Sequence, residues 1–578
     1  MHINRKSQYE KYPQIKIQNF EHQVFAGYGE ITEELKSRVK HTPFVMVVDC
    51  YPGVNDEEVL EALSRLGADR LVQTADIFKE EKAIREQLKY QLTDDRVFGK
   101  MYAGEILDFM DMEKLSEARA EVAEAKGFTV VYGFGASLVA RGDLLVYLDM
   151  ARWEIQLRYR KGMGNYRADN GDEDILRKYK RGFFVEWRIA DKHKAQLFER
   201  IDYLMDTNKA GEPKMISGRA FLESLREAAR RPFRTVPYFD PGVWGGQWMK
   251  EVLGLDSSEE NYAWSFDGVP EENSLLFNFG KAVVEVPAMD LVLYQPRQLL
   301  GEQVYARFGA EFPIRFDFLD TMGGQNLSFQ VHPLTEYIKK QFGMQYTQDE
   351  SYYILDAEED AAVYLGLKEG IDRDEMMEAL KDAQEGKCSF DAEKYINRFP
   401  AKKHDHFLIP AGTCHCSGSN AMVLEISATP YIFTFKLWDW GRLGLDGKPR
   451  PIHIEHGKNV IQWDRTTKWV EENLVNACYT VKEEDGYLEE HTGLHELEFI
   501  ETRRYWLDRP AELNTMGTVH MLNLVEGSAA VVESPSGDFE PYEVHYAETF
   551  IVPASVGAYR VRPAKDHERI GLIKAYVR

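Results

Sequence analysis

The sequence predicts a multidomain chain in which an N-terminal α/β unit with a parallel sheet is followed by mainly-β barrels. The chain has 578 residues, and single hydrophobic cores rarely extend beyond roughly 250–300 residues. From about 44 to 235, short β-branched runs alternate with long amphipathic stretches, a pattern typical of βαβ units. From about 236 the pattern changes to short strands separated by Gly, Pro and aromatic residues, which favours antiparallel sheets.

We expect three domains, at residues 1–235, 236–460 and 461–578. A helical insertion at about 366–398 interrupts the second. In the third, the strand-like segments 517–533 and 548–561 predict a smaller second barrel. Within the first domain we expect strands at 44–54, 128–136 and 144–150, and helices at 54–67, 113–127 and 153–162.

Composition and charge exclude several classes of function. The formal net charge is −24, so a general attraction to nucleic acid or to an anionic membrane is not expected. Hydrophobic residues make up 44% of the chain, but no run of them resembles a signal peptide or a membrane span. Five cysteines argue against a disulfide framework. We therefore expect a cytoplasmic protein.

The end of the first predicted strand, DCYPGVND, occupies the position where a nucleotide kinase carries its phosphate-binding loop. Gly53 is present, but no GK[ST] follows, so the lysine and hydroxyl that such a loop needs are missing. The later EIQLRYRKG, with Arg158, Arg160 and Lys161, resembles the basic lid helix of nucleoside kinases. The segment as a whole resembles a degenerate kinase-like domain, for which a structural or regulatory role is expected rather than phosphotransfer.

Four side chains in the second domain have the types and spacing of metal ligands. In NLSFQVHP, Gln330 and His332 are two residues apart in a strand-like run, so both point to one face. Glu350 and His415 follow in further strand-like segments. Two imidazoles and a carboxylate suit a catalytic zinc ion. The spacing alone leaves open that these residues are hydrogen-bonded polar side chains of the core.

The strings around these residues resemble those of class I mannose-6-phosphate isomerases, which belong to the cupin fold. LSFQVHP resembles their LSVQVHP, IPAGTCH resembles their IPAGTVH, and DWGRLGLDGKPRPIHIE resembles a stretch of the bacterial members. The resemblance runs from about 240 to 578 and is most specific at 325–455. It implies one Zn²⁺ per chain, held by Gln330, His332, Glu350 and His415.

The resemblance also implies an aldose–ketose isomerase that interconverts mannose 6-phosphate and fructose 6-phosphate through an enediol. The expected partner is therefore a small sugar or sugar phosphate. Two positions depart from the family pattern: Gln348 stands where the family has a lysine, and Lys436 where it has an arginine. Glutamine cannot exchange protons near neutral pH, so Lys436 is our expected catalytic residue.

These departures leave three functions open. The chain is an isomerase with rearranged catalytic groups, an isomerase for a different or unphosphorylated sugar, or a carbohydrate-sensing or scaffold protein that binds sugar phosphate without turnover. An iron-dependent redox cupin fits the same His, Glu and His ligands. His404 and His406 are candidate substitute bases, and Arg315 and Lys448 are candidate phosphate contacts.

Overall fold

The computed structural model describes residues 6–428, 431, 433–445, 447, 450–493 and 495–578. Its residues group into two compact units. Unit 1 comprises Met1–Pro13, Arg230–Val269 and Pro296–Arg578, and unit 2 comprises Gln14–Ala229 and Pro270–Gln295. The predicted boundary at 235 lies close to the start of the second segment of unit 1. Residues 270–295, which fall in the predicted second domain, are instead grouped with the N-terminal residues. The predicted division at 460 stays a prediction.

Unit 2 is built on a largely parallel sheet, as the alternating pattern predicts. Its strand order is β2-β8-β7-β6-β3-β5-β4, in which β4, β5, β3, β6 and β7 run parallel and β8 and β2 complete one edge in antiparallel pairing. The central strands are buried along their length, which is typical of a parallel sheet covered on both faces. The strands are β2 Val24–Ala26, β3 Phe44–Cys50, β4 Arg70–Gln73, β5 Phe128–Gly133, β6 Leu144–Asp149, β7 Tyr203–Asp206 and β8 Lys214–Ser217.

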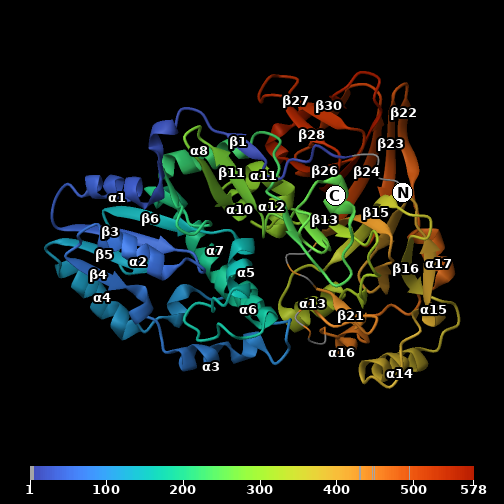
Figure 1. The fold of residues 1–578 in the computed structure, drawn as a ribbon, viewed down its shortest axis with the longest axis horizontal. Helices are drawn as coiled ribbons and strands as arrows, with labels where there is room; N and C mark the ends of the chain where they lie inside the picture. Colours follow the sequence, from blue (N-terminus) through green and yellow to red (C-terminus); the bar gives the residue numbers. More distant parts are fainter. Residues whose placement is uncertain (1–5, 429–430, 432, 446, 448–449, 494) are drawn as a thin grey trace. The chain divides into compact units, whose positions relative to one another are not determined.

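The helices of unit 2 pack around this sheet (Figure 1). Helix α2 shows how the sequence sets one of them: three acidic residues occupy its first turn, where they favour the positive end of the helix dipole, and Val59 and Leu63 lie four apart on the buried face. The helices are α1 Gly27–Arg38, α2 Asp56–Ser64, α3 Glu81–Leu92, α4 Met112–Glu124, α5 Arg152–Arg160, α6 Ile175–Arg181, α7 Trp187–Ala195, α8 Gly218–Ala228 and α10 Ala288–Tyr294.

A second, small sheet explains why residues 270–295 belong to unit 2. Strand β11 (Ser274–Asn278) pairs in parallel with β1 (Gln14–Lys16) and antiparallel with β12 (Val283–Pro287). From α10, Asp290 forms a buried ion pair with Lys194 at 2.6 Å. These contacts hold the segment within unit 2, although its strands have the same short, Gly- and Pro-bounded pattern as those that follow.

The first half of unit 1 consists of two antiparallel sheets. Their orders are β18-β15-β20-β13-β10-β9 and β17-β16-β19-β14-β21. The strands are β9 Tyr238–Asp240, β10 Trp264–Gly268, β13 Arg315–Asp320, β14 Phe329–Val331, β15 Asp349–Ala357, β16 Ala362–Leu367, β17 Ile396–Pro400, β18 His406–Ile409, β19 His415–Ser417, β20 Ala421–Ala428 and β21 Phe435–Trp438. Helices α14 (Arg373–Gln384) and α15 (Ala392–Tyr395) connect β16 to β17 and lie within the range of the predicted helical insertion.

Further helices of unit 1 lie between these strands or follow them in sequence. They are α9 Trp248–Val252, α11 Pro296–Leu300, α12 Glu302–Phe308, α13 Thr335–Phe342, α16 Ile454–Gly457 and α17 Thr467–Asn473. The α13 helix shows the pattern that fixes these elements: Ile338 and Phe342, four apart, are its buried residues, and Gly343 ends it in the left-handed region at φ 76°.

The second half of unit 1 contains another pair of antiparallel sheets, with orders β22-β23-β24-β31-β26-β29 and β25-β30-β27-β28. A cluster of buried apolar side chains that includes Leu522, Phe550 and Leu572 fills the space between them. The strands are β22 Tyr479–Glu484, β23 Tyr487–Gly493, β24 Ile500–Leu507, β25 Ala511–Asn514, β26 His520–Glu526, β27 Ala529–Glu533, β28 Tyr542–His545, β29 Thr549–Val552, β30 Ala558–Pro563 and β31 Ile570–Val577.

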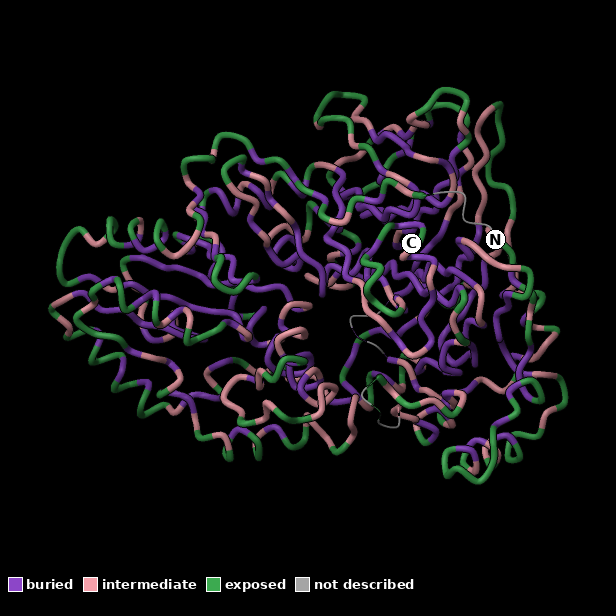
Figure 2. Tube along the Cα trace, viewed as in Figure 1, coloured by how far each residue is buried: buried purple, intermediate pink, exposed green. Residues whose placement is uncertain are grey.

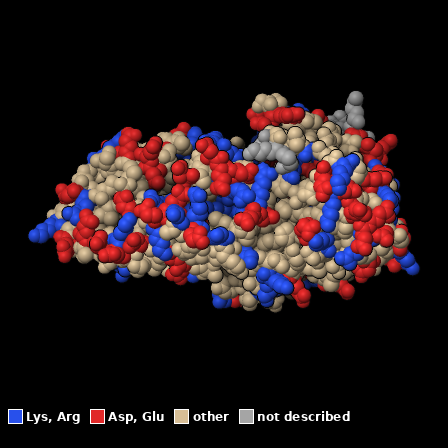
Figure 3. Space-filling view, turned by 90° about the horizontal axis from the view of Figure 1, so that it is seen from below, with Lys and Arg blue, Asp and Glu red and all other residues tan. Residues whose placement is uncertain are grey.

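Burial and charge agree with these assignments. Figure 2 shows buried backbone along the sheets and exposed residues at many loops and hairpin tips, and the edge strand β22 is exposed throughout. On the face drawn in Figure 3, Lys and Arg side chains lie among Asp and Glu side chains rather than in one continuous basic surface. None of the helices in the described ranges is long and apolar enough to cross a membrane.

Candidate metal centre

The register of one sheet brings three of the sequence-predicted residues into a single row. Gln330 on β14 is the antiparallel partner of His415 on β19 and of Lys436 on β21. Directly opposed residues of antiparallel strands point to the same face of the sheet. His332 lies two residues after Gln330 and therefore points to that face as well.

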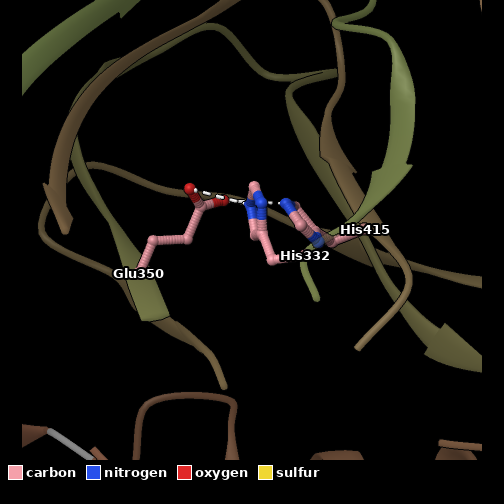
Figure 4. A group of neighbouring side chains, drawn as sticks. All are labelled: His332, Glu350 and His415. Atoms are coloured by element: carbon pink, nitrogen blue, oxygen red, sulfur yellow. Dashed lines mark ion pairs between the residues drawn. The ribbon is translucent and has the colours of Figure 1, made fainter. Parts of the chain in front are cut away.

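Glu350 reaches the same point from the other sheet. It lies on β15 and is 1% exposed. Its Oε1 lies 2.7 Å from His415 Nε2 and its Oε2 lies 3.1 Å from His332 Nε2. Figure 4 shows the two imidazole rings and the carboxylate converging from separate strands. One ligand atom from each of the three side chains lies within 4.8 Å of the others, and Gln330 Nε2 lies 3.2 Å from His415 Nε2.

Backbone carbonyls orient both imidazole rings. His332 Nδ1 donates to Phe433 O at 2.8 Å, and His415 Nδ1 donates to Thr413 O at 2.8 Å. With Nδ1 protonated, each neutral ring turns the lone pair of Nε2 toward Glu350. The buried atoms His332 Nε2 and Glu350 Oε1 make no hydrogen bond within the described part of the chain. This donor set fits a cation, because lone pairs of nitrogen and oxygen then share a positive centre.

The electrostatics of the three groups are coupled. Burial acts to raise the pKa of the Glu350 carboxyl, but the two neighbouring imidazoles outweigh it and hold this pKa well below its ordinary range. Burial acts to lower the pKa of His332, and the Glu350 carboxylate raises it above its ordinary value. The geometry therefore favours an ionised carboxylate with positive charge beside it.

Of the two positions that depart from the pattern of the resembled isomerases, Gln348 contacts the cluster and Lys436 is paired with Gln330. Gln348 donates through Nε2 to Glu350 Oε2 at 3.0 Å, and its Oε1 accepts from Phe433 N at 3.1 Å. Lys436, partly exposed on β21, shares the sheet face of Gln330 and His415. Gln348 therefore contacts a proposed ligand directly, whereas Lys436 is placed only by its pairing with Gln330.

The candidate substitute bases do not join the cluster. His406 on β18 is the partner of Tyr353, which lies on the opposite face of β15 from Glu350. His404 accepts from or donates to Tyr353 OH at 2.9 Å on that same side. Neither side chain therefore reaches the metal centre. Lys448, a candidate phosphate contact, lies outside the described residues.

The sequence did not predict a second group of polar residues, on the inner face of the six-stranded sheet. Glu425 on β20 is paired with Tyr352 on β15 and with Asp317 on β13. Tyr352 shares the face of Glu350, and its ring lies 5.8 Å from that of His415. Burial raises the pKa of Glu425 well above its ordinary value, and the charges of Glu350 and Asp317 add to this effect.

Arg315, a candidate phosphate contact, lies on the same inner face. It is paired with Ser427, which is paired in turn with Glu350. Its guanidinium forms a buried ion pair with Asp317 at 3.1 Å. In sequence, strand β20 reads AMVLEISA and is buried at every position, so alternation did not reveal which of its residues face inward.

In unit 2, the carboxyl edge of the parallel strands is filled by internal polar contacts. Asp49, at the end of β3, accepts from Gly135 N and Ser137 N at 2.9 Å each and contacts His193 Nε2 at 2.9 Å. Gly53 has φ 104°, and its carbonyl accepts from Arg158 Nη1 at 2.9 Å. Arg158, predicted to belong to a lid helix, therefore binds the loop that follows β3.

Lys194 fills the neighbouring part of this edge. Its Nζ lies 2.9 Å from both oxygens of Asp149, at the end of β6, and 2.6 Å from Asp290. The nearby enclosed cavity measures about 10 Å³, about the space of one water molecule. Kinase-like character of this unit stays a prediction.

The antiparallel sheets and the His–Glu–His cluster define the class of unit 1: a mainly-β unit with a buried site able to hold a metal ion. In fold, the chain is similar to the crystal structure of mannose 6-phosphate isomerase from Bacillus subtilis, with a TM-score of 0.50 and 18% identity, over 60% of this chain and all of that one. Residues 27–230 match a family described as "Domain of unknown function (DUF8485)".

Sequence comparison leads to the same proteins. Over 326 residues the chain is 22% identical to mannose-6-phosphate isomerase ManA of Bacillus subtilis (strain 168), which covers 56% of this chain and 94% of that protein. Over 221 residues it is 26% identical to mannose-6-phosphate isomerase of Streptococcus mutans, covering 38% of this chain and 64% of that protein. The chain is therefore homologous to mannose-6-phosphate isomerases over part of its length.

Proposed function

We propose that unit 1 is a metal-dependent aldose–ketose isomerase that interconverts mannose 6-phosphate and fructose 6-phosphate. The observation that carries this proposal is the convergence of His332, Glu350 and His415 on one buried point, in a chain whose homologues are named mannose-6-phosphate isomerases. We propose Gln330 as a fourth ligand, because its side-chain amide lies beside His415. Zinc is the proposed metal, since two imidazoles and a carboxylate suit it.

The reaction requires a proton to move between adjacent carbons while negative charge develops on the sugar oxygens. A bound zinc ion supplies electrostatic stabilisation of that charge. We propose that Lys436, which is paired with Gln330, supplies a further positive charge for an oxygen of the enediol or for the phosphate. Gln348 cannot carry a proton, so this role falls to another group.

We propose Glu425 as the proton-transfer group. It is a buried carboxyl two rungs along the inner face from the metal centre and is not one of the proposed ligands. In its ionised form, this carboxyl has the chemistry to accept a proton from one carbon and return it to the next. Arg315, on the same face, forms an ion pair with Asp317 and acts to lower the raised pKa of Glu425.

The experiment is a turnover assay with the full chain. Formation of fructose 6-phosphate from mannose 6-phosphate is measured for the purified protein, for the protein after complete chelation, and after Zn²⁺ is restored. We expect activity to disappear on chelation and to return with zinc. Turnover that survives complete removal of metal would overturn the proposal. Tight binding of sugar phosphate without turnover would instead favour the sensing or scaffold role.

For unit 2 we propose a structural or regulatory module of kinase-like descent. Its support is the parallel sheet together with the internal contacts that Gly53 and Asp49 make where a phosphate would bind. This role predicts that the unit does not transfer phosphate from ATP. Sustained ATP-dependent phosphorylation of a sugar by the purified chain would overturn it.

A further inference from the structure

A closed ring of contacts joins two of the proposed metal ligands through one amide side chain. Glu350 Oε2 accepts from Gln348 Nε2 at 3.0 Å, and Gln348 Oε1 accepts from Phe433 N at 3.1 Å. Phe433 O accepts from His332 Nδ1 at 2.8 Å, and His332 Nε2 returns to Glu350 Oε2 at 3.1 Å. Gln348, Glu350 and His332 are all buried. The ring therefore lies in a place where each contact is protected from water.

Each link of the ring fixes one degree of freedom of a ligand. The bond from His332 to Phe433 O sets which ring nitrogen is protonated and how the ring is turned. The bond from Gln348 to Glu350 fixes the orientation of the carboxylate. Because Gln348 also holds the N–H of Phe433, the peptide group that orients His332 is itself held in place.

The side-chain amide of Gln348 satisfies both ends of the ring. The position requires a donor toward Glu350 and, at the same time, an acceptor for the Phe433 N–H. Lysine has donors and no acceptor, and an ionised glutamate has acceptors and no donor. A hydrophobic side chain leaves the buried carboxylate oxygen and the buried N–H without this partner, which is costly in a dry interior.

We propose that Gln348 is a positioning residue that sets the metal affinity of the centre by holding Glu350 and, through Phe433, His332 in their binding orientations. The inference rests on the proposed metal site and does not depend on which sugar is isomerised. Gln348 acts through the two ligands and takes no part in proton transfer.

The test is the affinity for Zn²⁺ of the Gln348→Met variant, which keeps the length of the side chain and removes both the donor and the acceptor. Affinity is measured on the full chain by competition with a chromogenic chelator. We expect a dissociation constant about 10–100-fold higher than that of the unaltered protein, the usual cost of losing an outer partner of a metal ligand. The matched control is Gln247→Met. The side-chain amide of Gln247 donates a hydrogen bond to Glu260 O at 3.0 Å, also in unit 1. This substitution is expected to leave the zinc affinity unchanged.

A second readout separates positioning from simple stabilisation. The Co²⁺-loaded protein is compared with the variant by visible absorption, because the d–d spectrum reports the geometry of the ligands. Positioning predicts a changed spectrum together with weaker binding. A variant whose metal-free form melts at a lower temperature, with unchanged zinc affinity and an unchanged cobalt spectrum, would overturn the inference. Gln348→Leu provides the same comparison if the methionine variant does not fold.

The outcomes also distinguish this inference from the proposed function. An unaltered protein that binds zinc tightly and does not isomerise mannose 6-phosphate contradicts the proposed function and leaves the role of Gln348 standing. An active, zinc-dependent protein whose Gln348→Met variant binds zinc equally well contradicts only the role of Gln348.

Discussion

The two imidazoles of the cluster are prepared for a cation by groups outside it. His332 and His415 each commit Nδ1 to a backbone carbonyl, so each turns Nε2 toward the Glu350 carboxylate. A lone pair aimed at a carboxylate is unfavourable unless a positive charge lies between them. This arrangement gives each of the three side chains a measurable role.

Replacing either histidine by alanine is expected to remove most of the bound metal. Each substitution takes one of the few ligands from a site that needs about four. Metal content of the purified variants, measured by inductively coupled plasma mass spectrometry, should fall to a small fraction of the unaltered value. His495→Ala serves as the control, because His495 packs against Trp469 elsewhere in unit 1. Full metal content in both His332→Ala and His415→Ala would show that the cluster is not the metal site.

Glu425→Gln is expected to reduce turnover while leaving the metal in place. The amide keeps the size of the side chain and cannot transfer a proton, and general acid–base catalysis contributes about 10²–10⁴-fold to rate. The expected signature is a kcat lower by this factor, with similar KM and zinc content. Glu533→Gln, at the surface of β27 beside Arg562, is the control. A kcat within twofold of the unaltered protein would exclude Glu425 as the proton-transfer group.

At the residue scale, the sequence predicted the part of the site that depends on local periodicity. Gln330 and His332 are two apart on a strand, and both reach the cluster. Gln348 and Phe433 are 85 residues apart, and their contact is a hydrogen bond from the backbone N–H of Phe433. A pattern of side chains in the sequence therefore cannot predict it. Glu425 was missed because every residue of β20 is buried, and alternation is the signal that marks a face.

At the scale of single elements, β18 carries a buried histidine that couples stability to pH. His406 is fully buried, and burial lowers its pKa from an ordinary value of about 6.5 to about 3. The folded form therefore binds this proton more weakly than the unfolded chain. The stability that the neutral ring contributes is complete above about pH 6.5 and is lost as the pH falls toward 3.

The His406→Phe variant is accordingly expected to lose less stability on acidification than the unaltered protein. The free energy of unfolding is measured by urea titration at a series of pH values from 7 to 4. We expect a shallower decline for the variant over this interval. The exposed His567 gives the control variant His567→Phe, which should follow the unaltered protein. Identical slopes for all three proteins would disprove the assignment.

In unit 2, one lysine holds the loop that follows α5. Lys178 Nζ donates to Tyr159 O at 2.7 Å, Met163 O at 3.2 Å and Gly171 O at 2.6 Å. Lys178→Met leaves these carbonyls without that donor, at a cost of about 1–3 kcal/mol for each buried group. We expect faster amide hydrogen exchange across residues 162–171, and no change in the exposed control Lys161→Met. Unchanged exchange in the Lys178 variant would show that the loop is held by other contacts.

Periodicity predicted most of the elements themselves and was less informative about their grouping. Helices α14 and α15 lie where the sequence shows a helix pattern between Glu350 and His415. The segment 270–295 was not recognised as part of unit 2. In sequence, its strands resemble those of unit 1. The segment belongs to unit 2 because β11 pairs with β1, which lies more than 250 residues earlier.

For the whole molecule, the two units are expected to respond differently to metal. All four proposed ligands belong to unit 1. A ligand at 100 times its dissociation constant stabilises the form that binds it by about 2.7 kcal/mol. Differential scanning calorimetry with zinc and with chelator should therefore show one transition that moves to higher temperature and one that does not. A zinc-induced shift of equal size in every transition would contradict this assignment.

The path of the chain has a consequence for folding during synthesis on the ribosome. The backbone passes between the units four times, at 13/14, 229/230, 269/270 and 295/296. The nascent chain therefore cannot finish unit 2 when residue 229 emerges, because β11, β12 and α10 are still to come. Strand β10 of unit 1 is synthesised before these elements, whereas β13, one of the two strands that pair with β10, is synthesised after them. The two units must mature in overlapping time, and a gene truncated at any one of these crossings encodes at least one incomplete unit.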